Sequence, residues 1–237
     1  MNRAANVIMD NRGKKMWREW RGFLAFIVVM LLFRSAVADW NQVPSGSMLP
    51  SILVGDRIVV DKLAYDLRLP FTLHRLARWR EPERGDVVTF TSPEDDRLLV
   101  KRIVALPGDE VTLRDNRLVV NGVPATYELV PQTEQERSTF IPFLGYSLFR
   151  EQLLGSERYV LLRSDGSLGF TGNFSPIEVP ENHYLMLGDN RDNSRDSRVI
   201  GFIERDRILG RARTVAFSLD YDNYYAPRME RFLADLP

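Results

Sequence analysis

The sequence predicts a mainly β protein that is preceded by one N-terminal transmembrane helix. An uninterrupted apolar run covers residues 23–33. Later segments are short, rich in β-branched residues and bounded by glycine, proline and asparagine turns, and their helical periodicity is weak. A chain of 237 residues is also long enough to bury a sizeable core.

Turn signals divide the chain after residue 55 into strand-like segments. Gly55 precedes the first of them, and Pro107-Gly108-Asp109 closes the third. Asp115-Asn116 marks the turn of a hairpin. The expected strands cover residues 56–60, 86–90, 98–105, 111–123 (the hairpin), 184–187 and 208–218.

The distribution of motifs predicts an inserted second β domain at residues 110–183, which are rich in polar loops and separate two motif-bearing regions. The main β domain then consists of residues 40–109 and 184–237. Residues 63–83 are expected to be either a solvated loop or a loop that rests on anionic lipid headgroups. Their four arginines are Arg68, Arg75, Arg78 and Arg80.

The charges around the apolar run predict its orientation in a membrane. Residues 1–20 are basic, and after Arg34 no basic residue follows until Arg57. Because basic loops stay on the cytoplasmic side, the N-terminus is expected in the cytoplasm and the rest of the chain outside. A helical anchor over residues 21–39, with tryptophans at its ends, would span roughly 30 Å, about one hydrocarbon core.

A cleavable signal peptide is the alternative for this segment, because a basic start and an apolar core precede Ala36-Val37-Ala38. The long basic lead-in favours a retained anchor, as does Arg34 inside the region where cleavage would occur. We therefore expect the anchor to be retained.

Composition excludes several classes of function. Lys+Arg and Asp+Glu balance at 32 each, so no global charge favours nucleic acid. The absence of cysteine excludes disulfide scaffolds, thiol catalysis and cysteine-based zinc sites. The two histidines, His74 and His183, form no recognisable triad or zinc motif. We expect no metal and no cofactor.

A serine and a lysine are the strongest catalytic candidates. Ser47 follows Gly46, which permits a tight backbone approach, and the Ser47 amide and the Ser45 hydroxyl are candidate oxyanion donors. Lys101 can serve as a base only if its pKa falls from about 10.4, which burial against an apolar wall can achieve. Ordinary turn chemistry and an exposed lysine are the simpler alternatives for these residues. The expected wall consists of Val43, Met48, Leu99 and Val100.

The segment 188–198 mixes aspartates with arginines, which indicates an internal network of ion pairs that braces a loop. A solvated acidic turn is the alternative, whereas the spacing does not match a calcium loop. Ser194 in this segment could accept or donate a hydrogen bond at the Lys101 amine and orient it.

Three segments in this order resemble bacterial type I signal peptidase, a Ser-Lys serine protease. They are Pro44-Ser45-Gly46-Ser47-Met48 with Pro50 and Gly55-Asp56, then Lys101-Arg102 with Pro107-Gly108-Asp109, then residues 188–198. The resemblance implies that Ser47 is the nucleophile, Lys101 the general base, Ser45 the oxyanion donor and Ser194 the orienting residue. It also implies supporting roles for Gly188, Asp196 and Arg198. Two departures are Leu99, where some members carry tyrosine, and Ala105, where a glycine often stands.

The implied activity is removal of N-terminal signal peptides from exported preproteins after Ala-x-Ala sites, through an acyl-enzyme. The expected partners are signal peptides and the lipid bilayer of the bacterial inner membrane, with a monomeric enzyme whose catalytic domain lies on the periplasmic face. The alternatives are a specialised peptidase that matures one pilus or conjugation substrate, and an inactive membrane-anchored binding module. The expected substrate-binding residues are Gln42, Val43, Pro44, Met48, Ile52, Leu99 and Val100.

Overall fold

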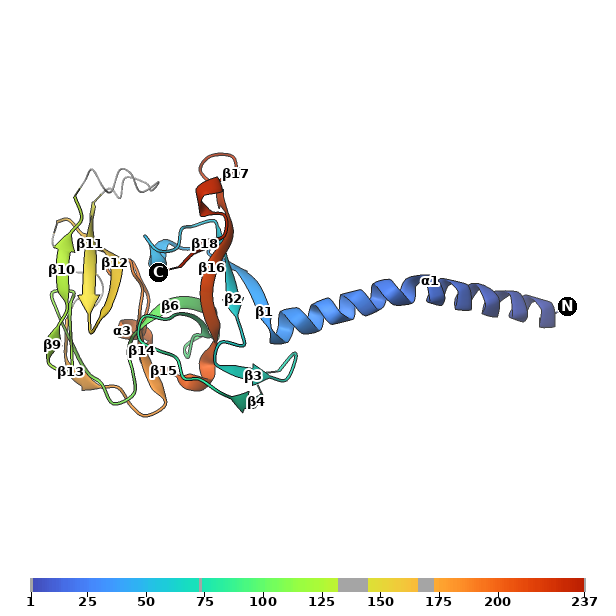
Figure 1. Ribbon diagram of the computed structural model, residues 1–237, viewed down its shortest axis with the longest axis horizontal. Helices are drawn as coiled ribbons and strands as arrows, with labels where there is room; N and C mark the ends of the chain where they lie inside the picture. The colour runs from blue at the N-terminus through green and yellow to red at the C-terminus, as the bar shows by residue number, and fades with distance from the viewer. Residues whose placement is uncertain (1, 73, 132–144, 166–172, 237) are drawn as a thin grey trace.

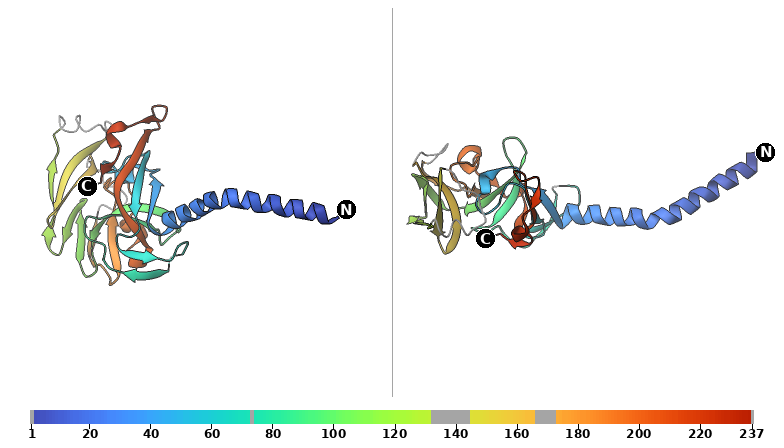
Figure 2. Two further views of the ribbon diagram at one scale, coloured as in Figure 1. Left: turned by 45° about the vertical axis from the view of Figure 1, so that its right-hand side comes forward. Right: turned by 90° about the horizontal axis from the view of Figure 1, so that it is seen from above.

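The computed structural model describes residues 2–72, 74–131, 145–165 and 173–236, with side chains from residue 16 onward. Helix α1 (Asn2–Ala36) projects from a body made mostly of β-strands (Figures 1 and 2). Within the described residues, no helix combines the length and the apolar character that crossing a membrane requires.

The helix ends earlier than the expected residue 39, because the chain turns into strand β1 (Ala38–Gln42) directly after Ala36. The junction is held by charged groups. Asp39 accepts a 2.8 Å hydrogen bond from Arg34 and lies 3.4 Å from the Lys62 amine. The Arg34 guanidinium also lies over the Trp40 ring, 4.6 Å from its centroid.

A nine-stranded sheet forms the main part of the body. Its path runs β1, β2 (Asp56–Asp61), β16 (Ile208–Asp220), β5 (Val87–Thr91), β6 (Leu98–Ala105), β14 (His183–Leu187) and β15 (Ile203–Glu204), and β17 (Ala226–Pro227) and β18 (Ala234–Asp235) also pair with β16. Each of the five expected single strands is present within one or two residues of its predicted limits. The prediction of a mainly β body is thus confirmed.

The described residues between 110 and 178 contain two small sheets. One contains β13 (Phe174–Glu178), β7 (Glu110–Arg114), β8 (Arg117–Val120) and β9 (Val123–Pro124), and the other contains β10 (Thr126–Leu129), β11 (Tyr146–Leu153) and β12 (Ser156–Arg163). The predicted hairpin turn at Asp115-Asn116 joins β7 to β8, with both residues at positive φ. These sheets share a core with the main sheet, since Val111 and Leu113 pack in one cluster with Leu185 and Leu187.

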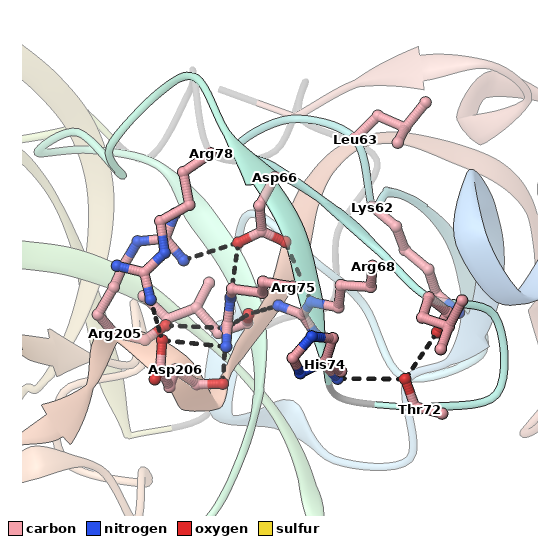
Figure 3. Close-up of polar contacts among 12 residues, drawn as sticks. Lys62, Leu63, Asp66, Arg68, Thr72, His74, Arg75, Arg78, Arg205 and Asp206 are labelled. Atoms are coloured by element: carbon pink, nitrogen blue, oxygen red, sulfur yellow. Dashed lines mark hydrogen bonds and ion pairs between the residues drawn. The ribbon is translucent and has the colours of Figure 1, made fainter.

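Residues 63–83 differ from the expected loop. They contain a hairpin of β3 (Asp66–Arg68) and β4 (Arg75–Arg78), which Figure 3 shows in detail. The buried Asp66 carboxylate pairs with Arg68 at 3.0 Å, Arg75 at 2.9 Å and Arg205 at 3.0 Å.

The other two arginines of this segment also have acidic partners, Asp206 for Arg78 and Glu83 for Arg80. The expectation of a solvated loop is wrong for Arg68 and Arg75, which are largely buried, and all four arginines lie in ion pairs within the protein. A sequence pattern could not reveal this, since Asp206 and Arg205 lie about 130 residues away in the 3₁₀ helix η2 (Arg205–Arg207). Contact of this segment with anionic headgroups stays a prediction.

Candidate active site

Ser47 lies in the short 3₁₀ helix η1 (Gly46–Met48), between β1 and β2. The helix is fixed from below by Met48, which is fully buried in a cluster with Val43 and Ile58. It is fixed from the side by Asn190, whose amide donates to the Ser47 carbonyl at 3.1 Å and whose side chain donates to the Gly46 carbonyl at 3.1 Å. The position of Ser47 is therefore fixed by the buried cluster around Met48 and by the hydrogen bonds from Asn190.

Lys101 reaches Ser47 from strand β6. Its Nζ donates to Ser47 Oγ at 2.6 Å, and the lysine is only 3% exposed. The two residues are 54 positions apart in the chain, and pairing of β6 with β5, with Lys101 opposite Val88, sets the position of the lysine. The structure thus brings together the two residues that the sequence singled out.

Burial lowers the pKa of Lys101 from 10.5 to about 8, because the charged amine loses its hydration. The negative charges of Asp196 and Asp189 oppose this effect, and the positive charge of Arg198 adds to it. A lysine with this pKa has an appreciable neutral fraction near neutral pH, which a general base requires.

Two buried ion pairs surround the lysine and limit how far the carboxylates can stabilise its charge. Arg102 binds Asp189 through two hydrogen bonds of 2.9 and 2.8 Å, and Ser51 donates to the same carboxylate at 2.5 Å. Arg198 binds Asp196 through two hydrogen bonds of 2.8 Å. The expected ion pairs of the segment 188–198 are thus present at Asp189 and Asp196. The parts that Arg102 and Ser51 play in them were not predicted, although both residues lie close to the motif residues in the sequence.

Asp196 also organises the loop that passes behind the site. It accepts a hydrogen bond from the Gly188 amide at 3.0 Å and caps α3 (Ser197–Ile200) by accepting from the Arg198 amide. Burial alone would raise the pKa of Asp196, but the hydrogen bonds and charge of Arg198 lower it below its usual value. The carboxylate therefore stays charged and keeps its partners.

Gly188 packs so closely that no side chain fits there. A Cβ at this position would lie 2.4 Å from the Ser47 carbonyl oxygen and 2.2 Å from Ser194 Oγ. The Ser194 hydroxyl is buried and helps to lower the pKa of Asp196, but among the described residues it makes no aligned hydrogen bond, neither to Asp196 nor to Lys101. The expected hydrogen bond from Ser194 to the lysine is absent from the described contacts.

Ser45 is exposed beside Ser47, with its hydroxyl 3.4 Å from Ser47 Oγ. Its backbone is extended, with φ −133° and ψ 155°, so that Ser45 leads directly into η1. A small cleft of about 80 Å³ opens at this point. Residues from β1, β2, β5 and β6 and from the segment after β1 line it beside Ser45, Ser47 and Lys101, namely Asn41, Gln42, Val43, Pro44, Ile58, Thr89, Leu98, Leu99 and Val100.

Five of the seven predicted substrate-binding residues lie in this cleft, whereas Met48 and Ile52 do not. Both are fully buried in the hydrophobic cluster that also contains Val60 and Val215. The lining residues that the sequence did not indicate are Asn41, Ile58, Thr89 and Leu98. The alternation of side chains shows which residues of one strand share a face. It does not show which strands lie side by side around the cleft.

Known proteins resemble this chain over most of its length. Residues 17–217 match the family described as "Signal peptidase, peptidase S26". A "Signal peptidase I" of Pseudomonas aeruginosa is 35% identical over 210 residues, which cover 84% of this chain and 71% of that protein. A "Signal peptidase I" of Rickettsia bellii is 32% identical over 224 residues, which cover 88% of this chain and 76% of that one.

A solved structure with the same description also matches part of the chain. It is a signal peptidase I from Enterococcus faecalis V583, 28% identical, with a TM-score of 0.34 over 56% of this chain and 97% of that chain. The family match covers far more than half of the residues, and the relatives at 32% and 35% identity agree with it. The chain therefore belongs to the signal peptidase family, peptidase S26, and is a serine endopeptidase.

Proposed function

We propose that the protein removes N-terminal signal peptides from exported preproteins, with Ser47 as nucleophile and Lys101 as general base. The observation that carries this proposal is the 2.6 Å contact between Lys101 Nζ and Ser47 Oγ in a site from which water is largely excluded. The names of its relatives, signal peptidase I, point to the same substrate class.

The chemistry follows from this pair. Neutral Lys101 takes the proton of Ser47 Oγ as the oxygen attacks the carbonyl of the scissile bond, and the Ser45 hydroxyl and the Ser47 amide donate to the resulting oxyanion. Collapse of the tetrahedral intermediate breaks the C–N bond, and protonated Lys101 gives its proton to the leaving amine. The acyl-enzyme is then hydrolysed by a water molecule that Lys101 deprotonates.

The substrate is proposed to bind as an extended strand between residues 42–44 and 97–100, so that its backbone hydrogen bonds extend the sheet. Side chains alternate along such a strand, so only the first and third residues before the scissile bond face the cleft. The volume of about 80 Å³ suits alanine at these positions. A cleft walled by Val43, Leu99 and Val100 also favours small apolar groups.

We also propose that α1 attaches the enzyme to the bacterial inner membrane, with its N-terminus in the cytoplasm and the catalytic body outside. The apolar side chains of residues 23–33 are exposed all around the helix. The tip of the β3–β4 hairpin lies beside the end of the helix, where the Phe71 amide donates to Ser35 Oγ at 2.7 Å.

The side chain of Phe71 is 69% exposed, and Trp40, Leu69 and Leu76 are exposed as well. Figure 1 shows the β3–β4 hairpin near the end of α1, so these exposed groups extend the apolar surface of the helix toward the body. Because the chain from Ala38 to Ser47 can reach at most about 30 Å, Ser47 would remain near the surface where cleavage sites emerge.

Cleavage of a purified preprotein with an Ala-x-Ala site in detergent tests this function. We expect the wild-type protein to cut after the second alanine and a folded Lys101→Ala variant to be inert. Lys62→Ala is the matched control and should cut normally, since Lys62 binds the Arg34 carbonyl far from Ser47. Equal cleavage by wild type and Lys101→Ala would refute the mechanism. No cleavage by any variant would favour a specialised peptidase or an inactive binding protein.

A further inference from the structure

One polar group in the cleft has no role in the proposed chemistry. Thr89 lines the cleft from the middle of β5 and is only 2% exposed. Its Oγ1 atom is buried and forms no hydrogen bond with any described residue. The threonine is paired directly with Val100 of β6, so both side chains lie on the same face of the sheet.

The surroundings of this hydroxyl are apolar. The same face carries Val43, Ile58 and Val87, which form one cluster with Val100 packed against it. Burying a hydroxyl without a hydrogen-bond partner costs free energy. Valine has nearly the shape of threonine and would fill this place without that cost. A bound substrate with a hydrogen-bonding group of its own would supply the partner that this buried hydroxyl lacks.

We propose that Thr89 selects preproteins with serine, rather than only alanine, at one of the two small positions that enter the cleft. This inference rests on the proposed function and names a substrate class for it. A serine side chain differs from alanine by one hydroxyl, so it fits nearly the same volume. Its hydroxyl and that of Thr89 can then form a hydrogen bond inside the cleft, with either oxygen as the donor.

Selectivity between serine and alanine depends on whether the Thr89 hydroxyl has a hydrogen-bond partner in the complex. With serine bound, both hydroxyls are satisfied in a site shielded from water. With alanine bound, the Thr89 hydroxyl remains unpaired, and the complex lacks one favourable contact. Sites with a hydrogen-bonding group for a substrate hydroxyl discriminate against analogues that lack it. The discrimination here is partial, because alanine meets no steric conflict.

The test compares cleavage of four preproteins that carry serine or alanine at the first or the third position before the scissile bond. For each enzyme variant, the readout is the ratio of kcat/KM for serine over alanine at each position. We expect Thr89→Val to lower this ratio by roughly five- to tenfold at one position, and Thr89→Ser, which keeps the hydroxyl, to preserve it.

Thr112→Val is the matched control, because Thr112 is also buried but lies on β7 outside the cleft, and its ratio should equal that of the wild type. A serine-to-alanine ratio that is the same in wild type and Thr89→Val at both positions would overturn the inference while leaving the peptidase function intact. Failure of the wild type to cut any of the four preproteins would instead overturn the proposed function, and this inference with it.

Discussion

At the scale of single residues, the central feature is a lysine whose charge is destabilised by its surroundings. Lys101 is buried beside two aspartates, yet each aspartate is already bound to an arginine. The carboxylates therefore compensate only part of the lost hydration, and the pKa falls to about 8. In the proposed mechanism this arrangement lets a lysine act as the base in place of a histidine.

The low pKa of Lys101 predicts that the residue costs stability. Between about pH 8 and 10.5 the unfolded chain binds a proton at Lys101 that the folded protein has lost, so the free energy of unfolding rises with pH in this window. The cost is largest below pH 8 and amounts to about 3 kcal/mol. Lys101→Met, which removes the charge, should abolish cleavage yet be more stable than wild type near pH 7. Urea titrations at pH 7 and pH 10.5 should show this advantage shrinking, and a Lys101→Met protein less stable at both pH values would contradict the assignment.

The sequence singled out Ser47 and Lys101 because their motifs are local and chemically distinctive, and the structure places the two side chains in contact. It indicated ion pairs in the segment 188–198, but it did not identify Arg102 and Ser51 as the partners of Asp189, since these contacts join residues 51 to 138 positions apart. The expected contact of Ser194 with the lysine rested on the position of Ser194 in the segment 188–198 and on the family resemblance. In the structure the hydroxyl lies against Gly188 instead.

At the scale of elements, the loop after β14 connects Ser47 to the buried ion pairs around Lys101. Gly188 marks the tightest point of this contact. We expect Gly188→Ala to reduce kcat by at least a hundredfold, because the new methyl group must displace Ser47 or Ser194. Gly22→Ala is the control, as nothing lies within 4 Å of the added Cβ there. Normal turnover by Gly188→Ala would show that this packing is dispensable.

The small sheets also contribute to the site through a buried carboxylate. Glu151 on β11 is fully buried and binds Arg158 at 2.6 Å and Arg191 of the same loop at 2.9 Å. The carbonyl of Arg191 in turn accepts a 2.6 Å hydrogen bond from Arg198. Burial would raise the pKa of Glu151, but the two arginines lower it to about 2, so the carboxylate is charged at all ordinary pH values.

Removing this charge should therefore be costly. We expect Glu151→Gln to lower the free energy of unfolding by about 3–5 kcal/mol, because two buried guanidinium groups lose their counter-ion. Glu157→Gln, on the neighbouring strand with a 52% exposed side chain, should change it by less than about 1 kcal/mol. Chemical denaturation monitored by tryptophan fluorescence measures both. Equal stabilities of the two variants would mean that the buried cluster does not brace the loop.

At the scale of the whole molecule, the β body was predictable and its assembly was not. Alternating apolar residues and turn signals marked most strands of the main sheet. The β3–β4 hairpin was missed because its arginines look like surface residues until Asp66 and Asp206 are placed beside them (Figure 3). The shared core between the small sheets and the main sheet likewise depends on contacts that no local pattern encodes.

Membrane attachment through α1 is a prediction at this scale. Val28 and Leu31 are exposed apolar residues in the middle of the helical run. Replacing both with aspartate should release the protein from vesicles in a flotation experiment, because each charge costs about 3 kcal/mol in a bilayer centre. Val123→Asp, at an exposed apolar site on β9, should float like wild type. Continued flotation of the double variant would contradict attachment through this helix.

The most direct test of the central claim is to identify the residue that becomes acylated. A peptide ester that ends in Ala-x-Ala, mixed with the enzyme and quenched early with acid, would leave its acyl group on the nucleophile for detection by mass spectrometry. The account predicts an adduct on Ser47 in the wild type and in Lys62→Ala, and none in Lys101→Ala. An adduct on another residue, or equal labelling of Ser47 without Lys101, would contradict it.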